Sequence, residues 1–199
     1  MSEKLLGNLP HGLIFVLSAP AGTGKTTLVS MLLDEFPCVA ESVSCTTRTP
    51  RPGEIPGKDY HFMDAEAFEA KIAAGDFLEY AQVFGSYYGT AGDYVQQQQE
   101  KGKHVFLVID TQGALQLKGK LDAVFIFVTP PSLQALRERL FKRKTENLEM
   151  IEQRLSFAKH EMAQSSKYDY NIVNDNLHHA YDILRSIVIA EEHRVRKAK

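Results

Sequence analysis

Apolar runs alternate with segments of helical periodicity along most of the chain. Four short and almost continuous apolar runs predict buried parallel strands, at residues 13–17, 104–109, 123–128 and 170–173. Apolar residues at helical spacing predict one helix that ends before Pro37 and three more at 133–142, 148–165 and 178–195. This order predicts an α/β fold in which a parallel sheet is covered by helices on both faces.

Residues 39–92 break this alternation. They contain three prolines, two short mixed strands at 60–62 and 77–80, and one amphipathic helix at 64–74. We expect a small α+β insertion here, within a core made of residues 1–38 and 93–199. A third segment, 142–152, is charged and nearly free of large apolar residues. Its pattern is typical of an ordinary solvated loop and equally of a mobile lid.

Composition narrows the classes of function. The 199 residues include 23 Lys and Arg against 25 Asp and Glu, a net charge of −2, which argues against a broad nucleic-acid-binding face. No apolar run approaches the roughly 18 residues of a membrane span, so no membrane association is expected. We therefore expect a cytoplasmic protein whose two cysteines, Cys38 and Cys45, remain reduced thiols.

The loop after the first predicted strand carries the strongest motif. Gly24, Lys25 and Thr26 match the end of the phosphate-binding pattern G-x-x-x-x-G-K-[ST], although Ala19 stands at its first glycine. A glycine-rich turn without a ligand is the alternative, but the position between a strand and a helix favours phosphate binding. The expected ATP-binding residues are Ala19, Pro20, Ala21, Gly22, Thr23, Gly24, Lys25, Thr26 and Thr27.

The chemistry of this loop asks for these residue types. Glycines at 22 and 24 allow successive N–H groups to face one anion. Lys25 can reach the β- and γ-phosphates, and the Thr26 hydroxyl can bind Mg²⁺ together with the phosphates and water. Asp110, at the end of the strand at 104–109, suits the acid near the metal and equally the N-cap of a helix that begins near Gln112.

Two arginines mark the insertion. Pro50 and Pro52 favour extended conformations at Thr49 and Arg51, so that Arg48 and Arg51 project from a stiff loop. Arginines held in this way suit the bidentate contacts of a phosphate monoester. On these residues alone, surface arginines in a turn are the commoner explanation.

Five motifs together resemble one family. The phosphate loop, Thr-Thr-Arg-Thr-Pro-Arg-Pro-Gly-Glu, Phe-Leu-Glu-Tyr-Ala, Tyr-Tyr-Gly-Thr and Ile-Asp-Thr-Gln-Gly follow one another as in guanylate kinases, over about residues 12–191. The resemblance implies a P-loop NTPase-type core, a GMP-binding domain at 39–92 and a lid at about 142–154. It also implies ATP and GMP as substrates, with Mg²⁺ as cofactor; the use of dGMP stays open, as does the choice between monomer and homodimer.

The resemblance also implies individual roles. Glu79 would accept hydrogen bonds from guanine N1–H and the exocyclic amine, which only guanine offers side by side. The residues implied for GMP binding are Ser44, Arg48, Arg51, Tyr60, Glu79, Tyr88, Thr90 and Asp110. Those implied for catalysis are Lys25, Arg48 and Arg51, with the lid arginines Arg139, Arg143 and Arg154.

The sequence departs from the family pattern at two places, and two alternative functions remain. Val108 stands where the family usually has an acid, and Lys142 and Lys144 flank Arg143 where the family has glycines. Guanylate-kinase-like modules without activity occur in scaffold proteins, but this chain keeps the phosphate-loop lysine and the acceptor-site residues. The other alternative is a kinase that acts on a different small acceptor.

Overall fold

Five parallel strands form the central sheet. The computed structural model describes residues 4–142 and 148–195. Its strands run in the order β2 (Val39–Ser42), β7 (His104–Val108), β1 (Ile14–Ser18), β8 (Val124–Thr129) and β9 (Tyr170–Val173). Each neighbouring pair is parallel. The α/β fold class is therefore confirmed, and the four predicted core strands are present with ends shifted by one residue at most.

Strand β2 is the difference from the sequence prediction. Residues 39–92 were expected to form the insertion, yet the first four of them pair with β7, with Ala40 opposite Val105 and Glu41 opposite Phe106. A strand of only four residues that includes Glu41 and Ser42 lacks the apolar run that identifies its neighbours. The core sheet thus takes in residues that the sequence pattern assigned to the insertion.

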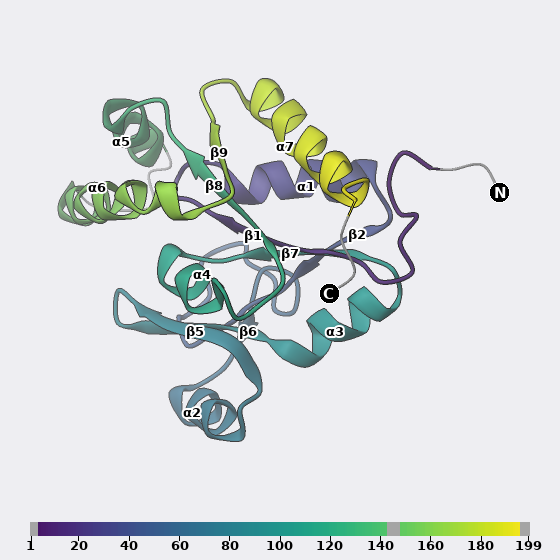
Figure 1. The fold of residues 1–199 in the computed structure, drawn as a ribbon. Helices are drawn as coiled ribbons and strands as arrows, with labels where there is room; N and C mark the ends of the chain where they lie inside the picture. The colour runs from purple at the N-terminus through teal and green to yellow at the C-terminus, as the bar shows by residue number, and fades with distance from the viewer. Residues whose placement is uncertain (1–3, 143–147, 196–199) are drawn as a thin grey trace.

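Helices cover both faces of this sheet (Figure 1). Alternate side chains of β1 point to opposite faces, so Phe15 and Leu17 pack with helices α1 (Lys25–Glu35) and α7 (Leu177–Glu192). Ile14 and Val16 pack on the other side with α3 (Gly92–Glu100) and α4 (Thr111–Leu117). Both faces of every central strand are buried, which explains why these strands are apolar along their whole length.

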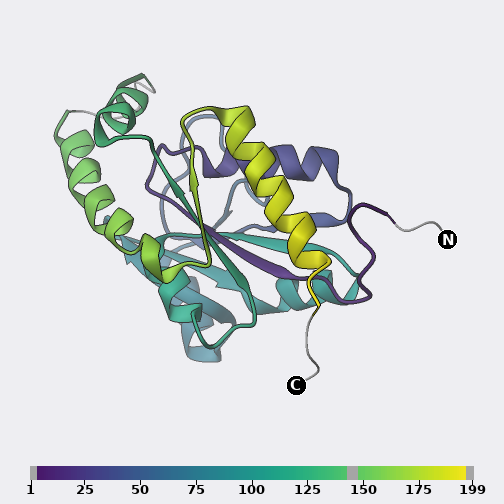
Figure 2. The same cartoon turned by 45° about the horizontal axis from the view of Figure 1, so that its top comes forward.

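A pair of helices extends to one side of the core. Helices α5 (Leu133–Lys142) and α6 (Leu148–Ala163) pack through Leu136, Leu140 and Ile151. In Figure 2 they lie together at the left edge, beyond β8 and β9. Residues 143–147, which include Arg143 and much of the predicted lid, lie outside the described residues. The second half of that lid, up to Arg154, is the beginning of α6.

The insertion has its own four-stranded sheet. Its order is β4 (His61–Phe62), β3 (Cys45–Thr46), β6 (Ser86–Ala91) and β5 (Phe77–Val83). Helix α2 (Ala65–Ala74) begins after Asp64, whose carboxylate accepts a hydrogen bond of 2.7 Å from Ala67 N. Fully buried Phe68 stacks against Phe77 and Tyr87 and fixes this helix on the sheet. The sequence predicted the helix but neither β3 nor β6.

A buried polar cluster stabilises the five-stranded core sheet at the end of the sheet that lies away from the phosphate loop. His104, at the start of β7, lies 2.6 Å from Glu192 of α7 and accepts a hydrogen bond from Leu13 N. Glu192 also accepts hydrogen bonds from the backbone N–H groups of Gly7 and Asn8. Burial alone would raise the pKa of Glu192, but these donors outweigh burial and the pKa falls below its usual range. The cluster binds the N-terminal segment to the core, away from the ends of the strands that carry the phosphate loop.

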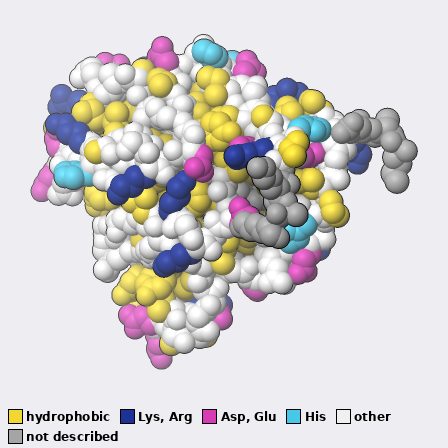
Figure 3. All heavy atoms as spheres, viewed as in Figure 1, with side chains coloured by type: hydrophobic (Ala, Val, Ile, Leu, Met, Phe, Trp, Pro, Cys, Tyr) yellow, Lys and Arg dark blue, Asp and Glu magenta, His cyan; other side chains and the backbone are white. Residues whose placement is uncertain are grey.

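The surface shows no dominant charge on the face drawn in Figure 3. Lys and Arg side chains lie interspersed there with Asp, Glu and apolar groups. Every helix within residues 4–142 and 148–195 is too short or too polar to cross a membrane.

Candidate nucleotide-binding site

One large cleft lies between the core and the insertion. It has a volume of about 840 Å³ and is lined by residues from both parts of the molecule and from α6. Most of the predicted site residues meet here: Ala19, Pro20, Ala21, Gly22, Gly24, Lys25, Thr26, Thr27, Ser44, Arg48, Arg51, Tyr60, Glu79, Tyr88, Asp110 and Arg154. The carboxyl ends of parallel strands meet at this edge of the core sheet, where α/β proteins bind ligands.

The phosphate loop joins β1 to α1 in the expected conformation. Gly22 and Gly24 have φ values of +89° and +100°, which only glycine adopts readily, and Gly24 is the N-cap of α1. Lys25 begins the helix, and its ammonium group donates to the carbonyl of Ala19, back across the loop. The loop is therefore folded around the place where an anion would bind, with the positive end of α1 directed at it.

Ala19 replaces the first glycine without strain. Among the described residues, Phe84 is the only non-glycine residue with a positive φ, so Ala19 occupies an ordinary backbone conformation. Its methyl group is buried, with 1% of the residue exposed. A side chain is accepted here because this position does not need the left-handed conformation of the two glycines that follow.

Asn174, the residue directly after β9, supports the phosphate loop. Its amide donates to the carbonyl of Thr23 over 2.7 Å, and a methyl group on Gly24 would lie 2.8 Å from the same amide nitrogen. Arg139 of α5 in turn donates to the Asn174 carbonyl over 2.9 Å. Neither Arg139 nor the fully buried Thr23 lines the cleft. Arg139 and Thr23 were predicted site residues, whereas Asn174, which connects them, carries no sequence signal of such a role.

Asp110 closes the floor of the cleft. Its carboxylate accepts a hydrogen bond of 2.9 Å from Gly113 N and caps α4, so the helix-cap interpretation is confirmed. The carboxylate also faces the cleft. A role beside the metal stays a prediction that the cap does not exclude, because one carboxylate oxygen suffices for the cap.

Glu161 is a buried acid that the sequence analysis missed. It lies on α6, is 6% exposed, and accepts a hydrogen bond of 2.9 Å from the Thr111 hydroxyl. Burial raises the pKa of Glu161, while the positive charges of Lys25 and Arg154 oppose that rise. Its place seven residues after Arg154, on the same face of one helix, is the signal that could have identified it.

Glu79 is the buried carboxylate of the insertion. It is 5% exposed and accepts a hydrogen bond of 2.6 Å from the hydroxyl of Thr90 on the neighbouring strand. Burial raises the pKa of Glu79 to about 7, with a smaller contribution from the charge of Asp110. Thr90 is fully buried and does not line the cleft, so it orients Glu79 from behind.

Helix α4 approaches Glu79 without a side chain. A methyl group on Gly113 would lie 2.1 Å from Glu79 Oε2, which is closer than two unbonded heavy atoms can come. Glycine at this position therefore makes room for the carboxylate. The motif Ile-Asp-Thr-Gln-Gly contains this glycine, but its role depends on a strand far away in the sequence.

The two arginines of the insertion have different surroundings. Arg48 forms an ion pair with Glu54 in which one guanidinium nitrogen, Nη2, donates to both carboxylate oxygens, at 2.7 and 3.0 Å. The guanidinium carbon lies 5.3 Å from the centroid of the Tyr60 ring. Glu54 also accepts from the backbone N–H of Arg51, whose side chain is exposed. Burial would raise the pKa of Glu54, but the hydrogen bonds from Arg48 and from the Arg51 backbone, together with the charges of both arginines, outweigh burial and lower the pKa. Glu54 thus orders the loop that carries both arginines.

A further carboxylate reaches the cleft from β2. Glu41 is half-buried, and burial raises its pKa to about 7, with a smaller contribution from Asp59. The sequence analysis did not name it, although a charged residue inside a strand of the core sheet is itself a signal. Cys45, which neighbours Ser44 in the sequence, is buried, and burial raises the pKa of its thiol.

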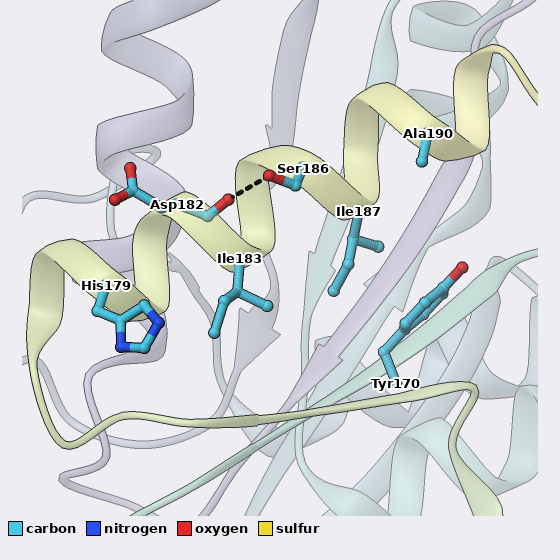
Figure 4. Close-up of a pocket in the computed structure, with 7 residues that line it drawn as sticks. All are labelled: Tyr170, His179, Asp182, Ile183, Ser186, Ile187 and Ala190. Carbon is cyan, nitrogen blue, oxygen red and sulfur yellow. Dashed lines mark hydrogen bonds between the residues drawn. The ribbon is translucent and has the colours of Figure 1, made fainter.

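A second hollow lies apart from this cleft. It runs between α7 and β9 and is lined by seven residues that include Tyr170, His179, Ile183 and Ile187 (Figure 4). Ser186 donates to the Asp182 carbonyl within α7 over 2.7 Å and so makes an ordinary helix contact. None of the predicted site residues lines this hollow, which makes the cleft the candidate site.

A phosphate loop that shares one cleft with an insertion bearing arginines and a carboxylate defines a P-loop protein that binds two phosphorylated ligands. The guanylate kinase family model matches residues 12–191. The chain is 58% identical over 191 residues to the guanylate kinase of Protochlamydia amoebophila, covering 96% of this chain and 97% of that relative. It is 48% identical to the guanylate kinase of Chlamydia felis, over 91% and 89% of the two chains.

A solved structure agrees. The crystal structure of guanylate kinase from Anaplasma phagocytophilum superimposes with a TM-score of 0.78 at 35% identity, covering 93% of this chain and 88% of that one. The chain therefore belongs to the guanylate kinase family. The resemblance drawn from the sequence motifs is confirmed.

Proposed function

We propose that this protein transfers the γ-phosphoryl group of ATP to GMP, giving ADP and GDP, and that the reaction is reversible. The observation that carries the proposal is the cleft, because it brings a folded phosphate loop and the buried carboxylate of Glu79 to one space. A phosphate loop alone fits any nucleotide, whereas a buried carboxylate needs two adjacent donors such as those of guanine. The names of the curated relatives support an enzyme rather than a scaffold module.

The acceptor brings its own nucleophile, so the protein has to position and neutralise charge. A phosphate oxygen of GMP is anionic at neutral pH and needs no strong general base. Arg48, already oriented by Glu54, and Arg51 would hold that phosphate and reduce its repulsion from ATP. Lys25 would turn from the Ala19 carbonyl to the β- and γ-phosphates, and Arg154 would bind the transferred group from α6.

Mg²⁺ is the cofactor that the family implies, and the residues present fit it. Thr26 exposes its hydroxyl to the cleft in the first turn of α1, which suits an ion that prefers oxygen ligands. The described residues contain no cluster of three His, Cys, Asp or Glu side chains that could hold a metal. The substrate phosphates and water would therefore complete the coordination. The bound ion neutralises phosphate charge.

The acceptor range tests this function directly. ADP release would be followed with GMP, dGMP, AMP and UMP as acceptors, at equal concentrations of MgATP. We expect transfer to GMP, and kcat/KM for AMP lower by about 10⁴-fold, because adenine presents no pair of donors to Glu79. Equal activity on AMP and GMP would overturn the assignment of the acceptor. The dGMP arm shows whether the ribose 2′-hydroxyl contributes.

We also infer a cytoplasmic location and a working unit of one or two copies. Reduced Cys38 and Cys45 support the location, since neither forms a disulfide. Light scattering of the purified protein at micromolar concentration distinguishes monomer from homodimer, and a larger assembly would contradict the inference.

A further inference from the structure

The tip of the β5–β6 hairpin holds an aromatic residue in an unusual backbone conformation. Val83 pairs with Ser86, so Phe84 and Gly85 form a two-residue turn with φ values of +48° and +81°. Turns of this kind favour Asn or Gly at the first position, where a bulky side chain is disfavoured. Among the described non-glycine residues, Phe84 alone adopts a positive φ. Strain of this kind persists where surrounding contacts maintain it, and it is common at functional sites.

The Phe84 ring makes its contacts with helix α6. The ring lies 5.7 Å from the ring of Phe157 in an edge-to-face arrangement, and its centroid is 5.5 Å from the guanidinium carbon of Arg154. Arg154 and Phe157 are three residues apart and so share one face of α6. All three line the cleft. In Figures 1 and 2 the tip of this hairpin lies beside α6, where the insertion meets the helix pair.

Besides packing on α5, helix α6 contacts both the core and the insertion. Glu161 connects it to the core through the Thr111 hydroxyl, and Phe84 connects it to the insertion. Arg154 belongs to the contact with the insertion. An arginine held near a ring by a cation–π contact keeps its charge and can still bind phosphate oxygens through its N–H groups. The contact also removes side-chain freedom that phosphate binding would otherwise have to remove.

We propose that Phe84 is a positioning residue that holds Arg154 at the cleft and couples the acceptor-binding insertion to helix α6. The inference deepens the proposed function, because it rests on the role of Arg154 at the transferred phosphoryl group. Phe84 touches neither nucleotide in this assignment. Its removal would lower the rate of phosphoryl transfer and leave the affinity for GMP nearly unchanged.

Three substitutions at Phe84 test the aromatic ring, the apolar contact and the strained backbone conformation separately. Phe84→Leu keeps an apolar side chain but has no ring face; we expect kcat to fall about fivefold to tenfold, with the Kd for GMP within about twofold of wild type. Phe84→Tyr keeps the ring and should retain kcat within about twofold. Phe84→Gly relieves the positive φ, so its melting temperature should match or exceed that of wild type while its kcat falls at least as far as that of Phe84→Leu.

A double-mutant cycle identifies the partner. In an Arg154→Met background, Phe84→Leu should cause no further loss of kcat, because the group that it positions is gone. Full multiplication of the two losses would overturn the proposal, as would an unchanged kcat in Phe84→Leu. The free enzyme gives a readout without turnover: the NMR signals of the Arg154 side chain should show a ring-current shift that Phe84→Leu removes and Phe84→Tyr restores. Absence of that shift in wild type would also overturn it.

Activity of the wild-type protein on GMP is the control that separates the proposed function from the proposed role of Phe84. A wild-type protein that transfers nothing to GMP would refute the proposed function and this inference with it. Suppose instead that the wild-type protein is active on GMP and that the two losses of kcat multiply fully in the double-mutant cycle. That result would refute only the role of Phe84.

Discussion

The phosphate loop and the proposed acceptor site are built by different means. The loop relies on backbone N–H groups, on two glycines with positive φ and on one lysine, all within ten consecutive residues. The acceptor site relies on side chains from separate strands and helices, with Glu79 on β5 oriented by Thr90 on β6 and accommodated by Gly113 on α4. A backbone site tolerates a change such as Ala19, whereas a side-chain site depends on every neighbour that shapes it.

The largest expected effect lies in the phosphate loop. Lys25→Ala removes the cation that we propose binds the ATP phosphates, so we expect kcat to fall by about 100- to 1,000-fold. The affinity for GMP and the melting temperature should change little, because the two sites are built independently. Steady-state kinetics with GMP titration calorimetry measure both. Loss of GMP binding in this variant would show that the loop and the acceptor site are not separable.

The acceptor site should be sensitive to one added methyl group outside it. Gly113→Ala would place carbon 2.1 Å from Glu79 Oε2, and the flexible carboxylate would move. We expect kcat/KM for GMP to fall by about 100-fold, with much less effect on IMP, which lacks the exocyclic amine.

The matched control for that variant is Gly92→Ala. A methyl group there would lie 3.3 Å from the Leu78 side chain and 3.8 Å from the Asp76 carbonyl oxygen, and its three nearest atoms do not include any of Glu79. A GMP preference over IMP that survives in Gly113→Ala would mean that Glu79 does not read the base from its observed position.

The protonation state of Glu79 should have an effect of intermediate size, on the affinity for GMP. Its pKa is raised to about 7 by burial, and in the proposed assignment guanine would bind the ionised form, so we expect affinity above pH 7 that is lost as pH falls. Between pH 8 and pH 6 the Kd for GMP should rise about tenfold. The GMP phosphate also titrates near pH 6, so the difference between wild type and Glu79→Gln isolates this carboxyl group. Parallel profiles in the two proteins would contradict the assignment.

The smallest effect should come from the residue that orders the arginine loop. Glu54→Gln loses the ion pair with Arg48, and we expect the KM for GMP to rise about threefold to tenfold through lost preorganisation. Glu66→Gln, on the exposed surface of α2, is the control. A lower KM in Glu54→Gln would show that Glu54 competes with the GMP phosphate for Arg48 rather than preparing Arg48 for it.

The sequence alone determined the local features of this protein. The strands at 13–17, 104–109, 123–128 and 170–173 and the phosphate loop follow from patterns within a few neighbouring residues, whereas the cap at Asp110 was one of two equal alternatives. Backbone conformation and burial of a single element depend on such short-range patterns. The motifs also identified the family, because they fall in contiguous stretches.

Tertiary structure decided what surrounds each of those features. It placed β2 in the core sheet, and it brought Thr111 to Glu161, Gly113 to Glu79 and Phe84 to Arg154. These relations join residues far apart in the chain, and their energies depend on burial and on charges from other elements. Periodicity reports which face of an element is covered, but it does not report which partner covers that face.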